Sequence, residues 1–180
     1  MKLTQRYAER FHKNLHLYKG RAVGFRADQV TVPGHQIAQR EYLTHPGAVG
    51  VLAFPSPHKI LLVKQYRFPI RQFTYEIPAG KLTAGENPLS CVHRELEEET
   101  GYRAVKIKKL LSYWPTAAFS TEVIHLYVAT HLVPTQMNPD EDEFIELVQL
   151  TPKQMERWMR NGKIRDSKTL IAYLAWKGLF

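Results

Sequence analysis

Two nearly continuous apolar runs, AVGVLAF at residues 48–54 and KILLVKQYRF at residues 59–68, constrain the fold most strongly. Strands with this pattern are covered on both faces, and the intervening PSPH turns the chain between them. With 180 residues, 44% of them apolar, the chain can bury one sizeable core, whereas two independent cores would be cramped. We therefore expect one domain over residues 1–180, in which helices cover a sheet.

The remaining segments predict further strands and three helices. RAVGFRADQVTV and QIAQREYLTH, with a turn at Pro33–His35, predict an N-terminal antiparallel strand pair. The patterns at residues 72–78, 106–114, 122–130 and 143–150 also predict strands. A helix is expected at 88–100, and two more at 151–163 and 166–180, the last two capped by Thr151 and by Asp166 or Ser167. This mixture predicts an α+β fold with helices on the faces of the sheet.

The helix at 88–100 ends in an unusual concentration of acid, RELEEETG. Each helical residue advances roughly 100°, so Glu95, Glu98 and Glu99 share one face, beside an apolar stripe formed by Leu89, Val92 and Leu96. Like charges at this spacing cost about 0.2–0.5 kcal/mol per pair. Acids in a last turn also oppose the helix dipole, by about 0.3–1 kcal/mol each. A sequence selected for stability alone would place lysine or arginine there.

A divalent cation would turn this repulsion into a binding site. Mg²⁺ takes oxygen ligands from a few carboxylates and leaves positions for water and substrate phosphates. From the residues alone, a solvated acidic helix face remains the alternative. Places where local rules are broken without visible compensation are where functional sites are expected.

The surrounding stretch, GKLTAGENPLSCVHRELEEETGY at residues 80–102, resembles the Nudix box. Nine constrained positions over these 23 residues match, and the last, usually aliphatic, is Tyr102. Such a match is far more specific than a three-residue pattern. The resemblance implies the Nudix fold, an α/β/α sandwich around a mixed β-sheet, and hydrolysis of nucleoside diphosphates linked to another group.

The same resemblance assigns roles around the helix. Glu95, Glu98 and Glu99, with the backbone carbonyl of Ala79, match the metal ligands, so Mg²⁺ is the expected cofactor and Mn²⁺ a possible substitute. Glu98 and Arg94 belong to the catalytic positions, and Arg94 would orient the acids because it lies four residues before Glu98. Glu86 is expected to be an auxiliary metal or structural carboxylate.

Segments outside the box resemble the ADP-ribose and nucleoside diphosphate sugar pyrophosphatase branch of the family. They are REYLTHPGAVGVLA, VKQYRFPIRQ, YEIPAGK and DEDEFIE. In that branch the N-terminal strands, here about residues 20–44, exchange between subunits, which implies a homodimer. A glutamate on the loop after the box serves as general base, and both Glu141 and Glu143 are candidates. The branch also implies substrate contacts from Arg67, Arg40, Arg71 and Glu76.

One departure from the branch broadens the expected substrate. The usual proline sixteen residues after the last box glycine is Ala117 here. We therefore expect an enzyme that hydrolyses nucleoside diphosphate sugars such as ADP-ribose or GDP-mannose, rather than ADP-ribose alone. Two alternatives stay open: a Nudix enzyme that removes pyrophosphate from RNA 5′ ends, and a Nudix domain that senses a nucleotide sugar without cleaving it.

Composition limits the partners. A net charge of +8 suggests an anionic ligand. The basic residues are spread along the chain without the aromatic and basic platform that single-stranded nucleic acid prefers, so a small phosphorylated substrate is expected rather than nucleic acid. The chain shows neither a secretory signal nor a membrane span, and its one cysteine, Cys91, is expected to be buried. These features favour a cytoplasmic location.

Overall fold

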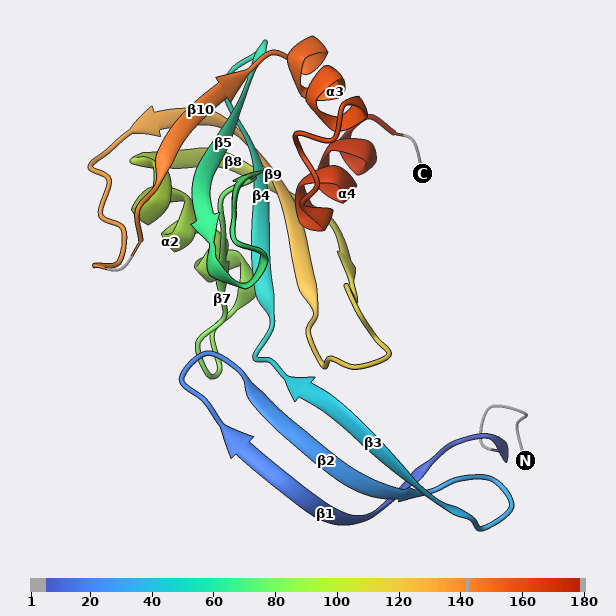
Figure 1. The fold of residues 1–180 in the computed structure, drawn as a ribbon. Coiled ribbons are helices and arrows are strands. Elements are labelled where there is room, and N and C mark those ends of the chain that lie inside the picture. Colours follow the sequence, from blue (N-terminus) through green and yellow to red (C-terminus); the bar gives the residue numbers. More distant parts are fainter. Residues whose placement is uncertain (1–5, 142, 179–180) are drawn as a thin grey trace. The chain divides into compact units, whose positions relative to one another are not determined.

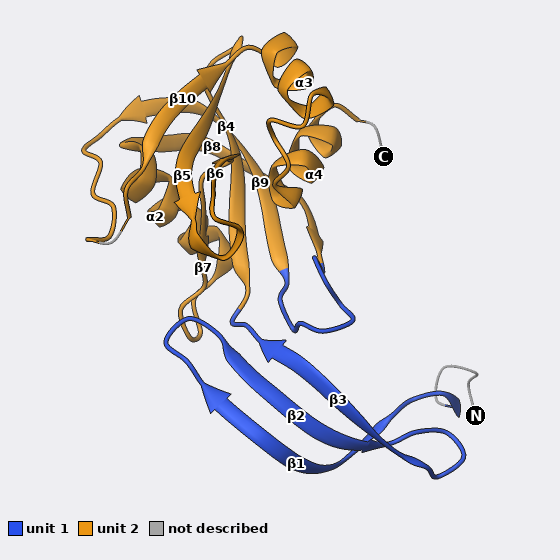
Figure 2. Ribbon diagram, viewed as in Figure 1, with its two compact units in different colours: residues 1–46, 114–123 blue, residues 47–113, 124–180 orange. Residues whose placement is uncertain are grey.

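A computed structural model describes residues 6–141 and 143–178 of the chain. It divides into two compact units, a smaller one of residues 1–46 and 114–123 and a larger one of residues 47–113 and 124–180 (Figure 2). Each unit is described by itself. The single domain expected over residues 1–180 stays a prediction.

The larger unit is built on a seven-stranded mixed sheet (Figure 1). Its path runs β10-β5-β4-β9-β8, with β6 paired to β5 and β7 paired to β4. The pair β4 and β9 is parallel, and all other pairs are antiparallel. The strands are β4 (Ala48–Ser56), β5 (Lys59–Arg67), β6 (Gln72–Glu76), β7 (Ala79–Lys81), β8 (Tyr102–Tyr113), β9 (Ile124–Pro134) and β10 (Glu146–Leu150), and a short 3₁₀ turn η1 (Phe68–Ile70) follows β5.

Helices cover both faces of this sheet, as the two apolar runs predict. Alternate residues of β4 enter two cores: Val49 and Val51 pack with helix α2 (Pro88–Thr100) on one face. Leu52 and Phe54 pack on the other face, with α3 (Pro152–Arg160) and α4 (Ser167–Trp176). Figure 1 shows α2 on the side of the sheet opposite α3 and α4. The α/β/α sandwich around a mixed sheet is therefore confirmed.

The helix ends follow the capping residues in the sequence. Asn87 accepts a hydrogen bond from the backbone of α2, and Gly101 ends that helix with a φ of 66°. Thr151 forms a capping box with Gln154 at the start of α3, and Asp166 caps α4. The predicted third helix extends to Phe180, but residues 179–180 lie outside the described residues.

The buried face of α2 differs from the expected apolar stripe. Leu89 is 46% exposed, whereas Cys91, Val92 and Leu96 are fully buried. The reason is that Glu95 and Glu99 also point inward, which centres the buried face on the acids and turns Leu89 toward solvent. The prediction that Cys91 is buried is confirmed.

The smaller unit is a three-stranded antiparallel sheet in the order β1-β2-β3. The hairpin of β2 (Gly24–Thr31) and β3 (Ile37–Thr44) is the expected strand pair, and β1 (Arg10–Lys19) was not expected. Its pairing with β2 shifts register between residues 11 and 13 and again between 14 and 16. These irregularities break the alternation that identifies a strand in sequence. Likewise β7 escapes prediction because it has only three residues.

Within the smaller unit, the segment at 114–123 returns to β3. The backbone N–H of Leu43 donates to the carbonyl of Phe119 at 2.9 Å, and that of Thr121 donates to the carbonyl of Leu43 at 3.0 Å. Ala27 and Asp28 are the buried positions among the described residues of this unit. No helix in the described part of the chain is both long and apolar enough to cross a membrane.

Candidate active site

The backbone of strand β7, which precedes α2 in the chain, contacts two carboxylates of that helix. The backbone N–H of Ala79 donates to Oε2 of Glu99 at 2.9 Å. At the next residue, Gly80, a Cβ atom would lie 1.9 Å from the carboxyl carbon of Glu95. Only glycine therefore allows the Glu95 carboxylate to pack on this strand. The box glycine has a steric function beside two of the predicted metal ligands.

Two of the three helical glutamates are buried. Glu95 is 8% exposed and Glu99 2% exposed, while Glu98 is partly open to solvent. Burial raises the pKa of Glu99 to about 8, and the negative charge of Glu95 also raises it. The hydrogen bond from the Ala79 N–H has the opposite effect and lowers this pKa. Burial likewise raises the pKa of Glu95, although the Arg94 charge opposes this. The site concentrates negative charge where a carboxylate is costly to ionise.

Arg94 is the cation closest to these acids. Its Nη1 lies 2.8 Å from Oε1 of Glu95 and 2.9 Å from Oε2 of Glu98. Its Nε lies 3.1 Å from Oε1 of Glu86, which also accepts a hydrogen bond from the backbone N–H of Thr83. The hydrogen bonds from Arg94 lower the pKa of Glu86 to about 2. Arg94 therefore lies among the acids, and Glu86 holds Arg94.

The two candidate general bases occupy different environments. The negative charge of Glu143 raises the pKa of both Glu95 and Glu99, so Glu143 lies within electrostatic range of the acidic pair. Its backbone N–H donates to the carbonyl of Asp140 at 2.9 Å, which closes a turn just before β10. Glu141 is exposed in the same loop, and its neighbour Asp142 lies outside the described residues. Of the two, Glu143 is the one that this geometry brings to the helix.

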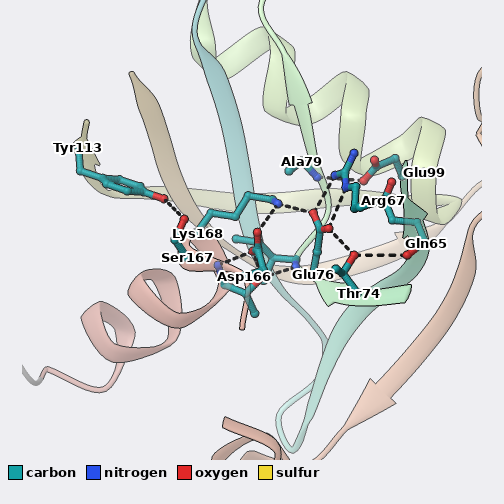
Figure 3. A network of polar contacts seen from close by, with 12 residues as sticks. Gln65, Arg67, Thr74, Glu76, Ala79, Glu99, Tyr113, Asp166, Ser167 and Lys168 are labelled. Carbon is teal, nitrogen blue, oxygen red and sulfur yellow. Dashed lines mark hydrogen bonds and ion pairs between the residues drawn. The ribbon is translucent and has the colours of Figure 1, made fainter. Parts of the chain in front are cut away.

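A second polar cluster surrounds Glu76 at the end of β6 (Figure 3). Arg67 donates to both carboxylate oxygens of Glu76, at 2.9 Å and 2.8 Å, and Lys168 from α4 pairs with the same carboxylate. These cations, with the Arg67 hydrogen bond first, lower the pKa of Glu76 to about 2 against the effect of its burial. The negative charge of Glu99 raises the pKa of Arg67, so the two clusters are electrostatically connected.

Two other predicted substrate contacts have different partners. The guanidinium of Arg71 stacks over the ring of Phe68, 4.2 Å from its centroid. Arg40 belongs to β3 of the smaller unit, where it pairs with Glu9. Arg67 binds Glu76 through Nε and Nη2, and its side chain is 43% exposed.

Comparison with known proteins agrees with this geometry. The model of the Nudix domain family matches residues 44–172. The chain belongs to the Nudix family. The match covers the mixed sheet, α2 and most of α4, and so includes every residue of both polar clusters.

Three comparisons place this Nudix chain further. It is 42% identical to the methanol dehydrogenase activator of Bacillus methanolicus, over 92% of this chain and 91% of the relative. It is 37% identical to the ADP-ribose pyrophosphatase of Bacillus subtilis (strain 168), over 87% and 85% of the two chains. A solved structure of an ADP compounds hydrolase superposes with a TM-score of 0.84 at 16% identity, covering 95% and 93%, which shows the shared fold.

The Nudix acids fit a hard divalent cation by their chemistry. The donor set at the helix is made of carboxylate and carbonyl oxygens, and two of the carboxylates are buried with raised pKa values. Nudix pyrophosphatases generally need a divalent metal. Among the described residues no three His, Cys, Asp or Glu side chains surround a common metal position, and Arg94 contacts both Glu95 and Glu98.

The sequence did not indicate the α4 residues of the second cluster. Lys168 donates to Oδ1 of Asp166 at 2.8 Å and pairs with Glu76, 92 residues earlier in the chain. Thr74 adds a hydrogen bond to Glu76 at 2.5 Å. Asp166 was interpreted only as a helix cap. No periodicity or spacing relates the start of α4 to the end of β6, so tertiary structure alone reveals this contact.

Proposed function

We propose that this Nudix protein hydrolyses the diphosphate bond of nucleoside diphosphate sugars, including ADP-ribose, with Mg²⁺ as cofactor. The enzyme is a hydrolase that acts on phosphorus anhydrides. The products are a nucleoside monophosphate and a sugar phosphate. The observation that supports this most directly is the buried acidic pair, in which Glu99 accepts from the Ala79 N–H and Glu95 packs on Gly80. Arg67, which Glu76 holds through two hydrogen bonds, is 43% exposed at its side chain.

We assign metal binding, proton removal and diphosphate binding to different residues of the chain. The Ala79 carbonyl and the three helical glutamates would hold the metal, which when bound neutralises diphosphate charge and acidifies a water. Glu143 takes a proton from the attacking water, because it is the carboxylate that joins the acidic pair from outside the helix. Arg67 holds the diphosphate oxygens through the part of its guanidinium that Glu76 leaves open.

Relatives support the substrate class. Besides the ADP-ribose pyrophosphatase, the chain is 30% identical to the GDP-mannose pyrophosphatase of Yersinia enterocolitica, over 73% of this chain and 74% of the relative. Both names describe sugars joined to a nucleoside through a diphosphate. With Ala117 in place of the usual proline of the ADP-ribose branch, we propose a preference that extends beyond ADP-ribose.

We also propose that the protein is a cytoplasmic homodimer in which Arg40 of the partner subunit contributes to substrate binding. The smaller unit buries Ala27 and Asp28 among its described residues, so its sheet has little core of its own. A sheet of three strands needs a covered apolar face for stability. A second copy of the chain is the partner proposed to cover it.

A substrate panel tests the activity. ADP-ribose, ADP-glucose, GDP-mannose, FAD, NADH and RNA with a 5′ triphosphate or cap are each incubated with Mg²⁺ and with EDTA. We expect release of nucleoside monophosphate from the sugars with Mg²⁺ and none with EDTA. Faster processing of RNA than of any sugar would replace the proposal with RNA 5′-end hydrolysis. Tight binding of ADP-ribose without any product would replace it with a sensor.

A second candidate function follows from the relative with 42% identity, which is named as an activator of methanol dehydrogenase. Many hydride-transfer enzymes use a nicotinamide dinucleotide, and that cofactor contains a diphosphate linkage. We propose that such an effect, if present here, uses the same acidic site. Purified methanol dehydrogenase assayed with wild-type protein and with Glu99→Gln tests it: stimulation by both proteins alike would separate activation from hydrolysis.

A further inference from the structure

We propose that Asp166, Lys168 and Thr169, at the start of α4, are positioning residues that fix Arg67 and the Ala79 segment for the reaction. The inference rests on the proposed function, because it assigns roles within the same site. It concerns a part of the chain that begins 65 residues after Gly101, the last glycine of the acidic motif. The carrying observation is a pair of contacts that join this helix start to Glu76 and Ile77, the first two residues of the short segment 76–79, whose last residue, Ala79, binds Glu99 of α2.

Lys168 first determines how Arg67 is held. The Glu76 carboxylate accepts two hydrogen bonds from Arg67, one from Thr74 and one from Lys168, which uses the accepting capacity of both oxygens. Lys168 is balanced in turn by Asp166, at 2.8 Å. Because Glu76 pairs with both Arg67 and Lys168, its single negative charge neutralises the charge of Arg67 only in part. Arg67 is thus fixed in direction yet retains attraction for a substrate anion.

Thr169 fixes the next residue of the segment. The backbone N–H of Ile77 donates to Oγ1 of Thr169 at 2.9 Å, and both residues are fully buried. The hydroxyl of Thr169 donates in turn to Oδ2 of Asp166 at 2.5 Å. Ile77 lies just after the last residue of β6, so the hydroxyl of α4 replaces a strand partner for this N–H.

Residues 76–79 are therefore held at every position. Lys168 and Arg67 bind Glu76, and Thr169 binds Ile77. The Pro78 carbonyl accepts from the N–H of Val51 at 2.9 Å, and the Ala79 N–H reaches Glu99. Two of these five anchors, Lys168 and Thr169, come from α4, and the segment ends at the carbonyl proposed to bind the metal.

Asp166 binds both Lys168 and Thr169. Its Oδ2 caps α4 by accepting from the Thr169 N–H at 2.9 Å, while its Oδ1 accepts from Lys168. A capping residue alone needs only the first of these bonds. The second bond aligns the Lys168 ammonium with Glu76, as Figure 3 shows. The helix cap is thereby linked to the substrate-facing arginine.

Two variants separate the two effects. Lys168→Met removes the charge that shares Glu76 with Arg67, so we expect KM for the nucleotide sugar to rise tenfold or more with a smaller change in kcat. Thr169→Val removes the hydroxyl that holds Ile77, so we expect kcat to fall tenfold or more with KM changed less than threefold. Lys168→Arg and Thr169→Ser keep the charge and the hydroxyl, and should recover most of each loss.

A matched control lies on the same helix. Lys177 follows the last residue of α4 and pairs with Glu156 at 3.2 Å, far along the helix from Glu76. Lys177→Met therefore removes an ion-paired lysine from α4 without touching the segment at 76–79. We expect its KM and kcat to remain within twofold of the wild-type values, and its Tm to fall less than that of Lys168→Met, because Lys177 is 40% exposed at its side chain and Lys168 12%.

A readout besides turnover is hydrogen exchange in the metal-free protein. We expect the Ile77 and Ala79 amides to exchange at least tenfold faster in Thr169→Val than in wild type and in Lys177→Met. If Lys168→Met and Thr169→Val lower Tm but leave KM, kcat and these exchange rates unchanged, α4 has a structural role only and the inference is overturned. If wild type cleaves no sugar of the panel, the proposed function fails. The exchange experiment then still tests the positioning role: faster exchange in Thr169→Val supports it, and unchanged exchange overturns it.

Discussion

At the level of single residues, Glu99 carries the strongest prediction. Glu99→Gln keeps an oxygen for the Ala79 N–H, at the position where Glu99 now accepts it at 2.9 Å, but cannot supply the carboxylate charge that a bound metal would need. We expect turnover to fall by orders of magnitude, because the metal would lose a ligand. Because ionising a buried carboxylate is costly, the metal-free variant should be at least as stable as wild type.

Thermal melting with and without Mg²⁺ checks the same residue. A ligand that binds only the folded state raises its stability, so Mg²⁺ should raise the Tm of wild type and raise that of Glu99→Gln much less. Glu97, on the same helix and half-buried, provides the control: Glu97→Gln should behave as wild type in both assays. Equal Mg²⁺ stabilisation of Glu99→Gln and wild type would remove Glu99 from the metal ligands.

The general base is a second prediction at this scale. Glu143 influences the pKa of the acidic pair, whereas Glu141 is exposed in the same loop. We therefore expect Glu143→Gln to lose about 10²–10⁴ in kcat, while Glu141→Gln keeps near-normal kcat. Rate measurements at saturating substrate decide between them. The reverse ranking of the two variants would make Glu141 the base.

Single residues also show what sequence could and could not predict in the site. Glu95, Glu98 and Glu99 lie on one helix, whose fixed rotation per residue makes their common face calculable. The contact between Arg94 and Glu98 is likewise local, and it forms as the four-residue spacing indicates. Lys168 and Glu76 meet only through the packing of α4 on the sheet, so nothing local predicts their contact.

At the level of elements, the end of α2 shapes the loop that follows β9. The Gly101 carbonyl accepts from the N–H of Thr135 at 2.7 Å, and the Glu98 carbonyl accepts from that of Asn138 at 3.0 Å. This loop leads toward Glu143. Gly101 has a positive φ of 66°, and a Cβ at this position would lie 3.0 Å from the backbone nitrogen of Met137.

Gly101→Ala should therefore destabilise the protein by more than a left-handed alanine alone, which costs about 1–2 kcal/mol. Gly85 is the matched control, because its φ is 80° but a Cβ there would meet nothing within 4 Å. Urea denaturation should give a larger loss for Gly101→Ala than for Gly85→Ala, and only the former should also lower kcat. Equal losses in the two variants would show that the contact with the loop contributes nothing.

The elements differ in how well their sequences identify them. Strands β4 and β5 were predicted because burial on both faces gives continuous apolar runs, and α2, α3 and α4 because their capping residues mark the ends. In contrast, β1 is exposed along nearly its whole length and irregular in pairing, so no hydrophobic pattern marks it. The order of strands in the sheet depends on long-range pairing, which local patterns do not predict.

At the level of the whole molecule, the exposed side chains of the smaller unit bear on assembly. Tyr18, Phe25 and Leu43 form a continuous cross-strand row over β1, β2 and β3, since Tyr18 pairs with Phe25 and Phe25 with Leu43. Their exposed fractions are 65%, 37% and 38%. Contiguous exposed apolar side chains of this kind mark protein interfaces. The row is therefore the place at which to test the proposed homodimer.

Phe25→Glu places a charge in the centre of this row, so it should dissociate the dimer by desolvation of the carboxylate. Sedimentation velocity should give a mass of two 20.9 kDa chains for wild type at micromolar concentration and of one chain for the variant. Lys19→Glu, at the exposed end of β1, should remain dimeric and controls for the added negative charge.

If Arg40 acts across the dimer, kcat/KM of Phe25→Glu should fall with dissociation and recover in part at high protein concentration. A wild-type protein that sediments as a monomer up to tens of micromolar would require a different partner for the smaller unit, because its exposed row would still need cover.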